Sequence, residues 1–359
     1  KKSLQYIKQL QPNKNYQGIA QGPFKYKKNP YYDPKIASMD KEMVDLVKQS
    51  IDLVNKQEAN GILEKNVTSK YLLTSNKVRA QEKDTSLYFS LRSLLNQNAS
   101  GHQTAVSRNL KSFPYIEATN HAAYIAKEAN IKKKSLRGKY TIIFEPYAFA
   151  NLLSNVGSSA SIFSLESGLS FLTQKGKKVA NKKVTISDDG RLPNGYNSTS
   201  FDSEGHPTKK NTIIKDGVFK TYLHNTSTAK KYKRKSTGNA GLISPEPHNI
   251  VLNNGKHSKD KLFSNIKQGL YITNLFYTRF NNYSTGDFSS IPRDGTFLIK
   301  NGEIKHGVKE IRISDNLLNM LKNIQYLGNK PQQIMTWEAS SPCTLPFTVI
   351  KDVNITRPN

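Results

Sequence analysis

Two turn sequences in the second half of the chain limit the folds that it can adopt. Residues 212–218 read Thr-Ile-Ile-Lys-Asp-Gly-Val, and residues 297–304 read Phe-Leu-Ile-Lys-Asn-Gly-Glu-Ile. Asp-Gly and Asn-Gly between β-prone runs are preferred centres of two-residue hairpin turns, because both turn residues need positive φ. We therefore expect two β-hairpins here, and mostly β structure from Lys183 to the end of the chain.

One helix interrupts this β-rich half. We expect Ser314 to cap the helix and Gly328 to follow its end. After it, residues 347–350 predict a final strand that 353–355 can continue. The predicted buried face of the helix consists of four apolar residues: Leu317, Leu318, Leu321 and Ile324.

The first half combines helices with short strands. A helix begins near Asp40, and another opens at Phe113-Pro114 and carries His121 on an alanine-rich sequence. Residues 97–104 read as a polar loop. The β-prone runs are 61–67, 71–73 and 85–91, with a turn at 75–77. The apolar face predicted for the first helix consists of Met43, Val44, Val47, Ile51 and Val54.

The basic stretch 132–139 reads as a domain boundary. Beyond it, residues 140–144 predict a strand, and a helix begins at Pro146. We therefore predict an α+β protein with two domains. Residues 1–138 would form an N-terminal α/β domain, and residues 139–359 a C-terminal β-rich domain with a curved or barrel-like sheet and a few helices.

Length and composition narrow the class of protein. A chain of 359 residues can bury enough apolar surface for two domains. Its single cysteine, Cys343, excludes an intrachain disulfide and a cysteine-rich zinc site, and it fits a cytoplasmic location. No apolar run is long enough for a membrane-spanning helix. The first five residues contain neither a start methionine nor a signal-peptide core, so we expect a partial chain.

The net charge of +27, from 54 Lys and Arg against 27 Asp and Glu, is the unusual feature of the composition. Such a charge suits a phosphate-binding surface for nucleic acid. However, the lysines are spread along the chain and far outnumber arginines, which lead in base recognition. We interpret the charge as a solvated surface and keep nucleic-acid binding as an alternative. The densest clusters are 132–134, 175–178, 182–183 and 230–235.

The segment from Asp188 to Gly241 resembles a known family. It reads Asp-Asp-Gly-Arg-Leu-Pro-Asn-Gly at 188–195, Phe-Asp-Ser-Glu-Gly-His-Pro-Thr at 201–208 and Ser-Thr-Gly-Asn-Ala-Gly at 236–241. Their order and spacing resemble the central region of the TldD/PmbA family, and the PmbA (TldE) branch in particular. The family is usually longer at its N-terminus. The chain departs from it at Arg293-Asp294-Gly295, where the family tends to have Gly before the β-run.

The resemblance implies the position of a zinc site in related proteins. In TldD-type members a helix carries His-Glu-x-x-x-His, with a third, cysteine ligand near the C-terminus, and zinc activates water beside a general base. Here the helix after Pro146 matches that register, but Ser154 and Ser159 replace the histidines and Asn155 replaces the glutamate. Serine is a poor zinc ligand and Asn cannot act as a base. We therefore predict no metal and no catalytic residue at these positions.

The remaining candidates have plainer interpretations. Cys343 lies near the region of the family's cysteine ligand but lacks the Gly that should follow it, so we expect a structural thiol. His121 has no ligand partner at i+4, so we expect an ordinary histidine. The small-residue loop Ser236, Thr237, Gly238 and Asn239 is a candidate contact for a peptide read through its backbone. We expect turn-forming hydrogen bonds from the acidic residues Asp188, Asp189, Asp202 and Glu204.

The resemblance implies a PmbA/TldE-like, non-catalytic subunit without a cofactor of its own. Zinc is expected in a TldD-like partner, and the pair would process unstructured peptides in the cytoplasm as a heterodimer or larger complex, with a homodimer also possible. On this interpretation the chain alone binds no stoichiometric zinc and cleaves no peptide. Two alternatives remain: a stand-alone hydrolase with a non-zinc active site, and a basic nucleic-acid-binding protein.

Overall fold

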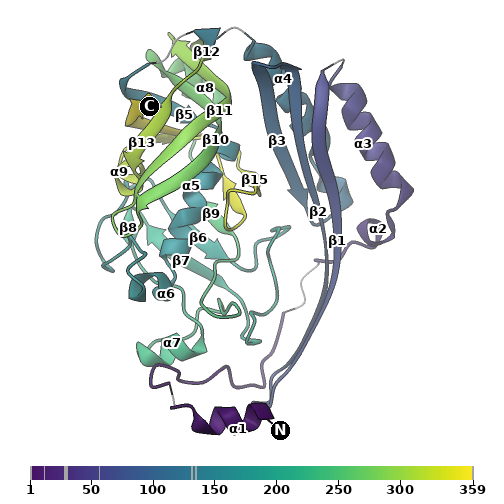
Figure 1. Cartoon of the computed structure of the whole chain (residues 1–359), viewed down its shortest axis with the longest axis vertical. Helices are drawn as coiled ribbons and strands as arrows, with labels where there is room; N and C mark the ends of the chain where they lie inside the picture. Colours follow the sequence, from purple (N-terminus) through teal and green to yellow (C-terminus); the bar gives the residue numbers. More distant parts are fainter. Residues whose placement is uncertain are drawn as a thin grey trace.

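The computed structural model describes residues 2–11, 13–27, 31–55, 57–130, 132–133 and 136–357. It has the predicted α+β architecture, with 39% strand and 23% helix and a closed, barrel-like sheet of five strands. Figure 1 shows a long three-stranded sheet standing beside a larger β-rich body. No helix among the described residues combines the length and hydropathy that crossing a bilayer requires.

The three-stranded sheet is an antiparallel meander. It consists of β1 (Glu58–Leu73), β2 (Arg79–Asn96) and β3 (Ala99–Ser107), with β2 in the middle. The turn predicted at 75–77 joins β1 to β2. The predicted polar loop 97–104 is wrong, because only residues 97 and 98 form a turn and the rest lies in β3. The polar residues of β3 are buried against the rest of the protein, which hides the strand from a hydrophobic pattern.

Helices cover one face of this sheet. They are α2 (Pro34–Ser38), α3 (Lys41–Leu53) and α4 (Tyr115–Glu128), and a 3₁₀ turn, Leu110–Ser112, precedes α4. Gly101 on β3 lets α4 approach closely, because a Cβ there would lie 2.0 Å from the carbonyl oxygen of Ala122. The helix α3 begins at its predicted place, but its predicted apolar face is largely wrong. Val44, Val47 and Ile51 are exposed, while Met43 and Val54 pack inward.

The β-rich body is built around a ring of strands. In order round the barrel these are β10 (Gln268–Asn282), β5 (Gly138–Phe144), β17 (Thr348–Thr356), β13 (Arg312–Asn316) and β11 (Asp287–Lys300), which pairs with β10 again. Three shorter strands join the same sheet: β12 (Glu303–Val308), β4 (Lys132–Lys133) and β14 (Ile324–Leu327). Closing the ring removes the exposed sheet edges that would invite aggregation.

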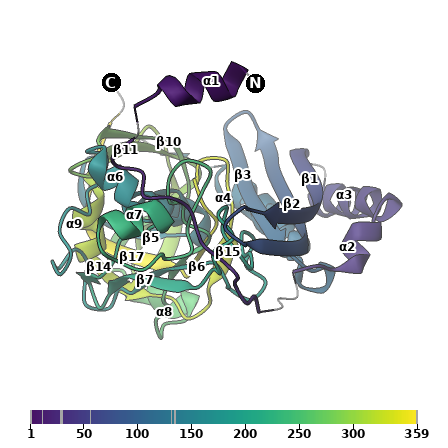
Figure 2. The same ribbon diagram turned by 90° about the horizontal axis from the view of Figure 1, so that it is seen from below.

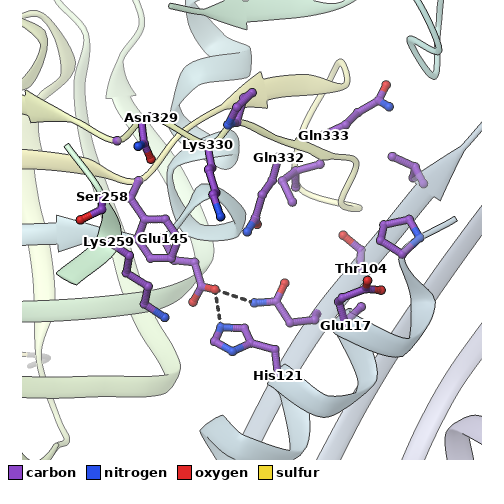
Figure 3. A pocket seen from close by; sticks show the side chains of 18 of the residues that line it. Thr104, Glu117, His121, Glu145, Ser258, Lys259, Asn329, Lys330, Gln332 and Gln333 are labelled. Carbon is purple, nitrogen blue, oxygen red and sulfur yellow. Dashed lines mark hydrogen bonds and ion pairs between the residues drawn. The ribbon is translucent and has the colours of Figure 1, made fainter. Parts of the chain in front are cut away.

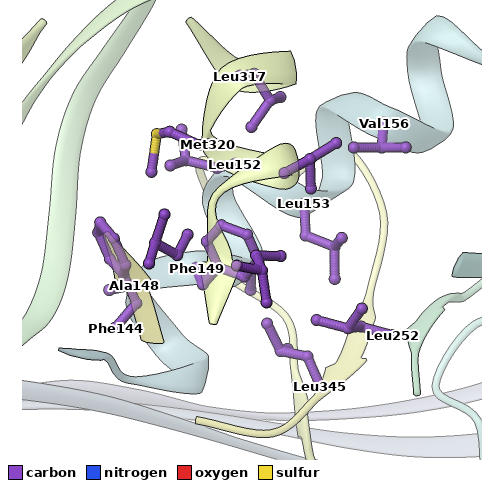
Figure 4. Close-up of a cluster of buried hydrophobic side chains, with 14 of the residues drawn as sticks. Phe144, Ala148, Phe149, Leu152, Leu153, Val156, Leu252, Leu317, Met320 and Leu345 are labelled. Carbon is purple, nitrogen blue, oxygen red and sulfur yellow. The ribbon is translucent and has the colours of Figure 1, made fainter. Parts of the chain in front are cut away.

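A second sheet packs beside the barrel, with a helix between the two. Its strands, in order, are β15 (Gln332–Ile334), β16 (Cys343–Leu345), β9 (Ile250–Leu252), β6 (Ile186–Asp189), β7 (Lys210–Lys215) and β8 (Val218–Phe219). The helix α5 (Pro146–Ser159) is buried along nearly all of its length. Figure 4 shows its apolar side chains among Phe144 of the barrel, Leu252 and Leu345 of the second sheet, and Leu317 of a later helix. This cluster is the main core of the protein.

Both predicted hairpins are confirmed. Asp216-Gly217 joins β7 to β8 and Asn301-Gly302 joins β11 to β12, and all four residues have positive φ. The late helix is also present, as α9 (Leu317–Lys322), but its predicted cap is wrong. Ser314 lies in β13, and Asn316 caps the helix by accepting a hydrogen bond from the Asn319 amide.

The N-terminal segment packs against the second half of the chain. After α1 (Lys2–Gln9) it runs across α7 (Thr226–Lys231), as Figure 2 shows. The Gln17 amide donates to Ser227 Oγ at 2.8 Å, and the Tyr26 hydroxyl donates to the Gly205 carbonyl at 2.7 Å. The proposed boundary between residues 138 and 139 stays a prediction. The remaining helices are α6 (Ile162–Glu166) and α8 (Lys259–Ser264).

A buried carboxylate joins the three-stranded sheet to the barrel. Asp294 on β11 accepts hydrogen bonds from Ser100 Oγ on β3 at 2.6 Å and from Asn274 Nδ2 on β10 at 2.5 Å. It also forms an ion pair with Arg92 on β2, at 3.4 Å. Asp294 has φ of 60°, a conformation that Asp tolerates better than most residues.

We expect Asp294→Ala to lower the free energy of unfolding by about 3 kcal/mol, because it leaves the partly buried Arg92 without its carboxylate. Asp352→Ala is the matched control, since Asp352 also has positive φ but lies exposed on β17. Urea denaturation of both variants measures the difference. Equal losses in the free energy of unfolding would mean that the buried interactions of Asp294 contribute nothing beyond the effect of its backbone conformation.

The same joint makes stability sensitive to acid. Burial lowers the pKa of His102 to about 4, although Asp294 opposes the shift. The unfolded imidazole titrates near ~6.5. The unfolded chain therefore binds this proton first as pH falls. Stability is intact above about pH 6.5 and declines towards pH 4 by about 1.4 kcal/mol per pH unit. We expect His102→Gln to reduce this dependence by one proton, measured by urea unfolding at several pH values.

Candidate functional site

A cleft of about 910 Å³ lies between the three-stranded sheet and the β-rich body. One wall comes from β3 and α4, and the other from α8 and the segment 328–334. Figure 3 shows Lys259 and Lys330 on the body side and Thr104 and Glu117 on the sheet side. Both β3 and β15 are edge strands of their sheets, and both contribute residues to the cleft.

A buried glutamate organises the floor of this cleft. Glu145 is 1% exposed and immediately precedes α5. Its Oε1 lies 2.5 Å from His121 Nε2 and accepts a hydrogen bond from Gln103 Nε2 at 3.1 Å. Its Oε2 accepts from the Tyr271 hydroxyl at 2.9 Å. Both carboxylate oxygens therefore have hydrogen-bond partners within the protein.

His121 is partly buried, with its side chain 25% exposed, and it contacts the buried Glu145 at the floor of the cleft. It lies on α4, and its partner Glu145 follows 24 residues later, so no local spacing could reveal the pair. The local sequence shows only that an acidic residue, Glu145, directly precedes Pro146 at the predicted start of a helix. Among the described residues, no protein atom bonds to the buried hydroxyl of Thr104, which also lines the cleft.

A family model described as the PmbA/TldA metallopeptidase C-terminal domain matches residues 137–357. The chain belongs to the PmbA/TldD family. An uncharacterized protein of Methanocaldococcus jannaschii is 29% identical over 323 residues, which cover 84% of this chain and 74% of that protein. Metalloprotease PmbA of Escherichia coli O157:H7 is 33% identical over 197 residues, covering 53% of this chain and 42% of its own length.

Solved structures agree with this assignment. A structure from Thermotoga maritima, described as a modulator of a DNA gyrase, superimposes with a TM-score of 0.87 at 25% identity and covers 95% of this chain and 80% of that one. TldE from Thermococcus kodakarensis superimposes with a TM-score of 0.88, covering 98% and 82%, and at 22% identity it supports the fold alone. The chain spans less than half of the E. coli metalloprotease, so that activity does not transfer automatically.

The positions matched to the family's zinc motif lie on α5, away from the cleft lining. Ser154 is fully buried, and its hydroxyl donates to the Asn151 carbonyl at 3.1 Å. Asn155 donates to the same carbonyl at 2.9 Å, and Ser159 is also buried. These donors do not fit zinc, because they are neutral and two of them already serve the helix backbone. Within the described residues, no three His, Cys, Asp or Glu side chains converge to hold a metal ion.

Cys343 is buried on β16, with its sulfur 3.5 Å from the carbonyl oxygens of Ala150 and Ser341. Burial raises the pKa of the thiol well above its usual range, so the reactive thiolate is disfavoured. This environment is that of a structural thiol. Asp189 and Asp202 form turn hydrogen bonds, accepting from the Arg191 and Glu204 amides. Asp188 and Glu204 instead accept from distant backbone amides, those of His248 and Thr226.

The loop 236–239 faces into the protein. Thr237 Oγ1 accepts from the His224 amide at 2.7 Å, and Asn239 Nδ2 donates to Asp188 Oδ2 at 2.7 Å. Asp188 is completely buried, and burial raises the pKa of its carboxyl group. None of Ser236, Thr237, Gly238 and Asn239 lines the cleft. Their substrate-binding role stays a prediction, and their hydrogen bonds indicate a structural role.

Asn239→Ala separates these two roles. We expect a loss of about 2 kcal/mol in the free energy of unfolding, because the fully buried carboxyl group of Asp188 is left without one of its hydrogen bonds. Asn254→Ala, at an exposed position, is the control. Urea denaturation and calorimetric titration with an unstructured peptide are the measurements. Unchanged stability with weakened peptide binding would favour the substrate-binding role.

Proposed function

We propose that this chain is a PmbA/TldE-like subunit that lacks the family's zinc chemistry and works within a TldD/TldE-type metallopeptidase complex. The observation that carries the proposal is the chemistry of α5, where the buried or backbone-bonded, neutral Ser154, Asn155 and Ser159 stand at the positions that the resemblance matches to His-Glu-x-x-x-His. Family membership and a fold like that of TldE support it. In this proposal a TldD-like partner carries zinc, and the complex processes unstructured peptides in the cytoplasm.

The cleft gives the subunit a place for an extended peptide. Its two walls present edge strands, to which an extended chain can add through main-chain hydrogen bonds. The cleft is lined by carboxylates, amides, hydroxyls and lysines. This polar lining suits the main chain of a peptide better than it suits an apolar side chain. A heterodimer is the proposed assembly, and a homodimer is the alternative.

Nucleic-acid binding receives less support. Part of the basic cluster 230–235 already serves the protein, because Lys231 pairs with Glu166 at 2.8 Å and Lys230 donates to the Gln17 carbonyl at 3.2 Å. Affinity for DNA or RNA that falls steeply with salt, and that is lost on charge reversal across 230–235, would favour it.

Co-purification from the native cell, followed by metal analysis, tests the proposal. We expect the chain alone to hold far less than one zinc per chain and to show no chelator-sensitive peptidase activity. We expect the complex to contain zinc and to cleave unstructured peptides. The control is a complex whose partner has alanine in place of the first histidine of its His-Glu-x-x-x-His motif. One tightly bound zinc in the isolated chain would overturn the proposal.

A further inference from the structure

The His121–Glu145 pair has the arrangement of an oriented base. An ionised Glu145 can only accept hydrogen bonds, as it does from Gln103, and in that state the 2.5 Å contact places the proton on His121 Nε2. The lone pair of a neutral imidazole is then on Nδ1. Among the described residues Nδ1 has no hydrogen-bond partner, and the His121 side chain is 25% exposed in a residue that lines the cleft.

The surroundings hold the imidazole in place. Tyr124, one turn along α4, stacks on the His121 ring at 6.1 Å with an interplanar angle of 16°. Tyr271 and Gln103 fix the Glu145 carboxylate from its other sides. A base oriented by a buried carboxylate, which is itself held by further donors, is the arrangement found in hydrolases that activate a nucleophile.

A cation lies beside this pair. Lys259 Nζ stands 5.1 Å from the centre of the Phe347 ring and 5.9 Å from that of Tyr271, the residue that bonds Glu145. Figure 3 shows the Lys259 side chain extending toward Glu145. Among the described residues, no carboxylate lies within ion-pair distance of Lys259 or Lys330 in the same cleft. A cation of this kind can stabilise an oxyanion that develops on a substrate.

We propose that the cleft is a metal-independent site for acyl hydrolysis, in which His121 is the general base and Glu145 positions it. His121 Nδ1 takes a proton from water while the water oxygen bonds to the carbonyl carbon of the substrate. The electron pair of the carbonyl moves to its oxygen, which faces Lys259. When the tetrahedral intermediate collapses, the bond to the leaving oxygen or nitrogen breaks, and His121 returns the proton to the leaving group.

This site is separate from the lost zinc site. Glu145 precedes the first residue of α5, whereas Ser154, Asn155 and Ser159 lie in the second half of the helix and do not line the cleft. The inference concerns the isolated chain in the presence of chelator, and the proposed partnership concerns zinc in a complex. Either can fail without the other.

The experiment follows p-nitrophenyl acetate hydrolysis by the purified full chain in excess EDTA. We expect His121→Gln to lower the rate by about 100-fold, the lower end of the range for a general base. His306→Gln is the matched control, because His306 does not line the cleft and its Nδ1 bonds the carbonyl of the adjacent Gly307. We expect its rate to stay within about twofold of the original, since that variant leaves the base in place.

Glu145→Gln tests the positioning role. The amide keeps the size of the side chain but reverses the preferred tautomer of His121, so we expect a loss of at least ~10-fold and a shifted pH–rate profile. Thermal unfolding of each variant separates loss of the fold from loss of the base. If Glu145→Gln does not fold, His121→Gln decides alone. A rate for the original chain that equals that of His121→Gln would overturn the proposal.

Discussion

The burial of Asp294 between two sheets is the interaction on which the arrangement of the molecule depends. One carboxylate binds side chains from β2, β3 and β10, so it fixes the three-stranded sheet against the barrel. Arg108 makes a second tie beyond the far end of β3, donating at 2.7 Å to the carbonyls of Gly195 and Tyr196. Because a buried charge without partners is costly, each tie tolerates little displacement. The cleft between the sheet and the body keeps its shape for this reason.

The ties also explain the family-specific segment that begins at Asp188. The first loop of this segment, residues 190–200, bonds to the end of β3. Asn194 Oδ1 in this loop accepts a hydrogen bond from the Arg108 amide at 2.9 Å. Glu82 on β2 accepts from the Ser200 amide at 2.7 Å. The short polar and glycine-rich sequences therefore serve as backbone geometry and as contacts between the two parts. They identify the family without forming its reactive centre.

What the sequence could predict depends on how far apart the interacting residues are. The hairpins at 216–217 and 301–302 were predictable because positive φ is a property of the turn itself. The strand β3 was not predictable, because its polar residues Gln103 and Thr104 are buried by residues that are distant in the sequence. The exposure of the apolar residues on α3 could not be predicted either. Helical spacing shows that a face is apolar but does not show what covers it. His121 and Glu145 lie on different elements, so only the fold reveals that pair.

The helix α5 connects these observations. Its second half carries Ser154, Asn155 and Ser159 and is tightly packed: a Cβ on Gly157 would lie 2.5 Å from Ile250 Cδ1. Two histidines and an ion would have to displace that packing at fully buried positions, at a cost of the kind that overpacked cores show. The residue just before the same helix, Glu145, is buried at the floor of an open cleft. The polar groups at the start of the helix therefore meet the cleft, while its second half belongs to the core.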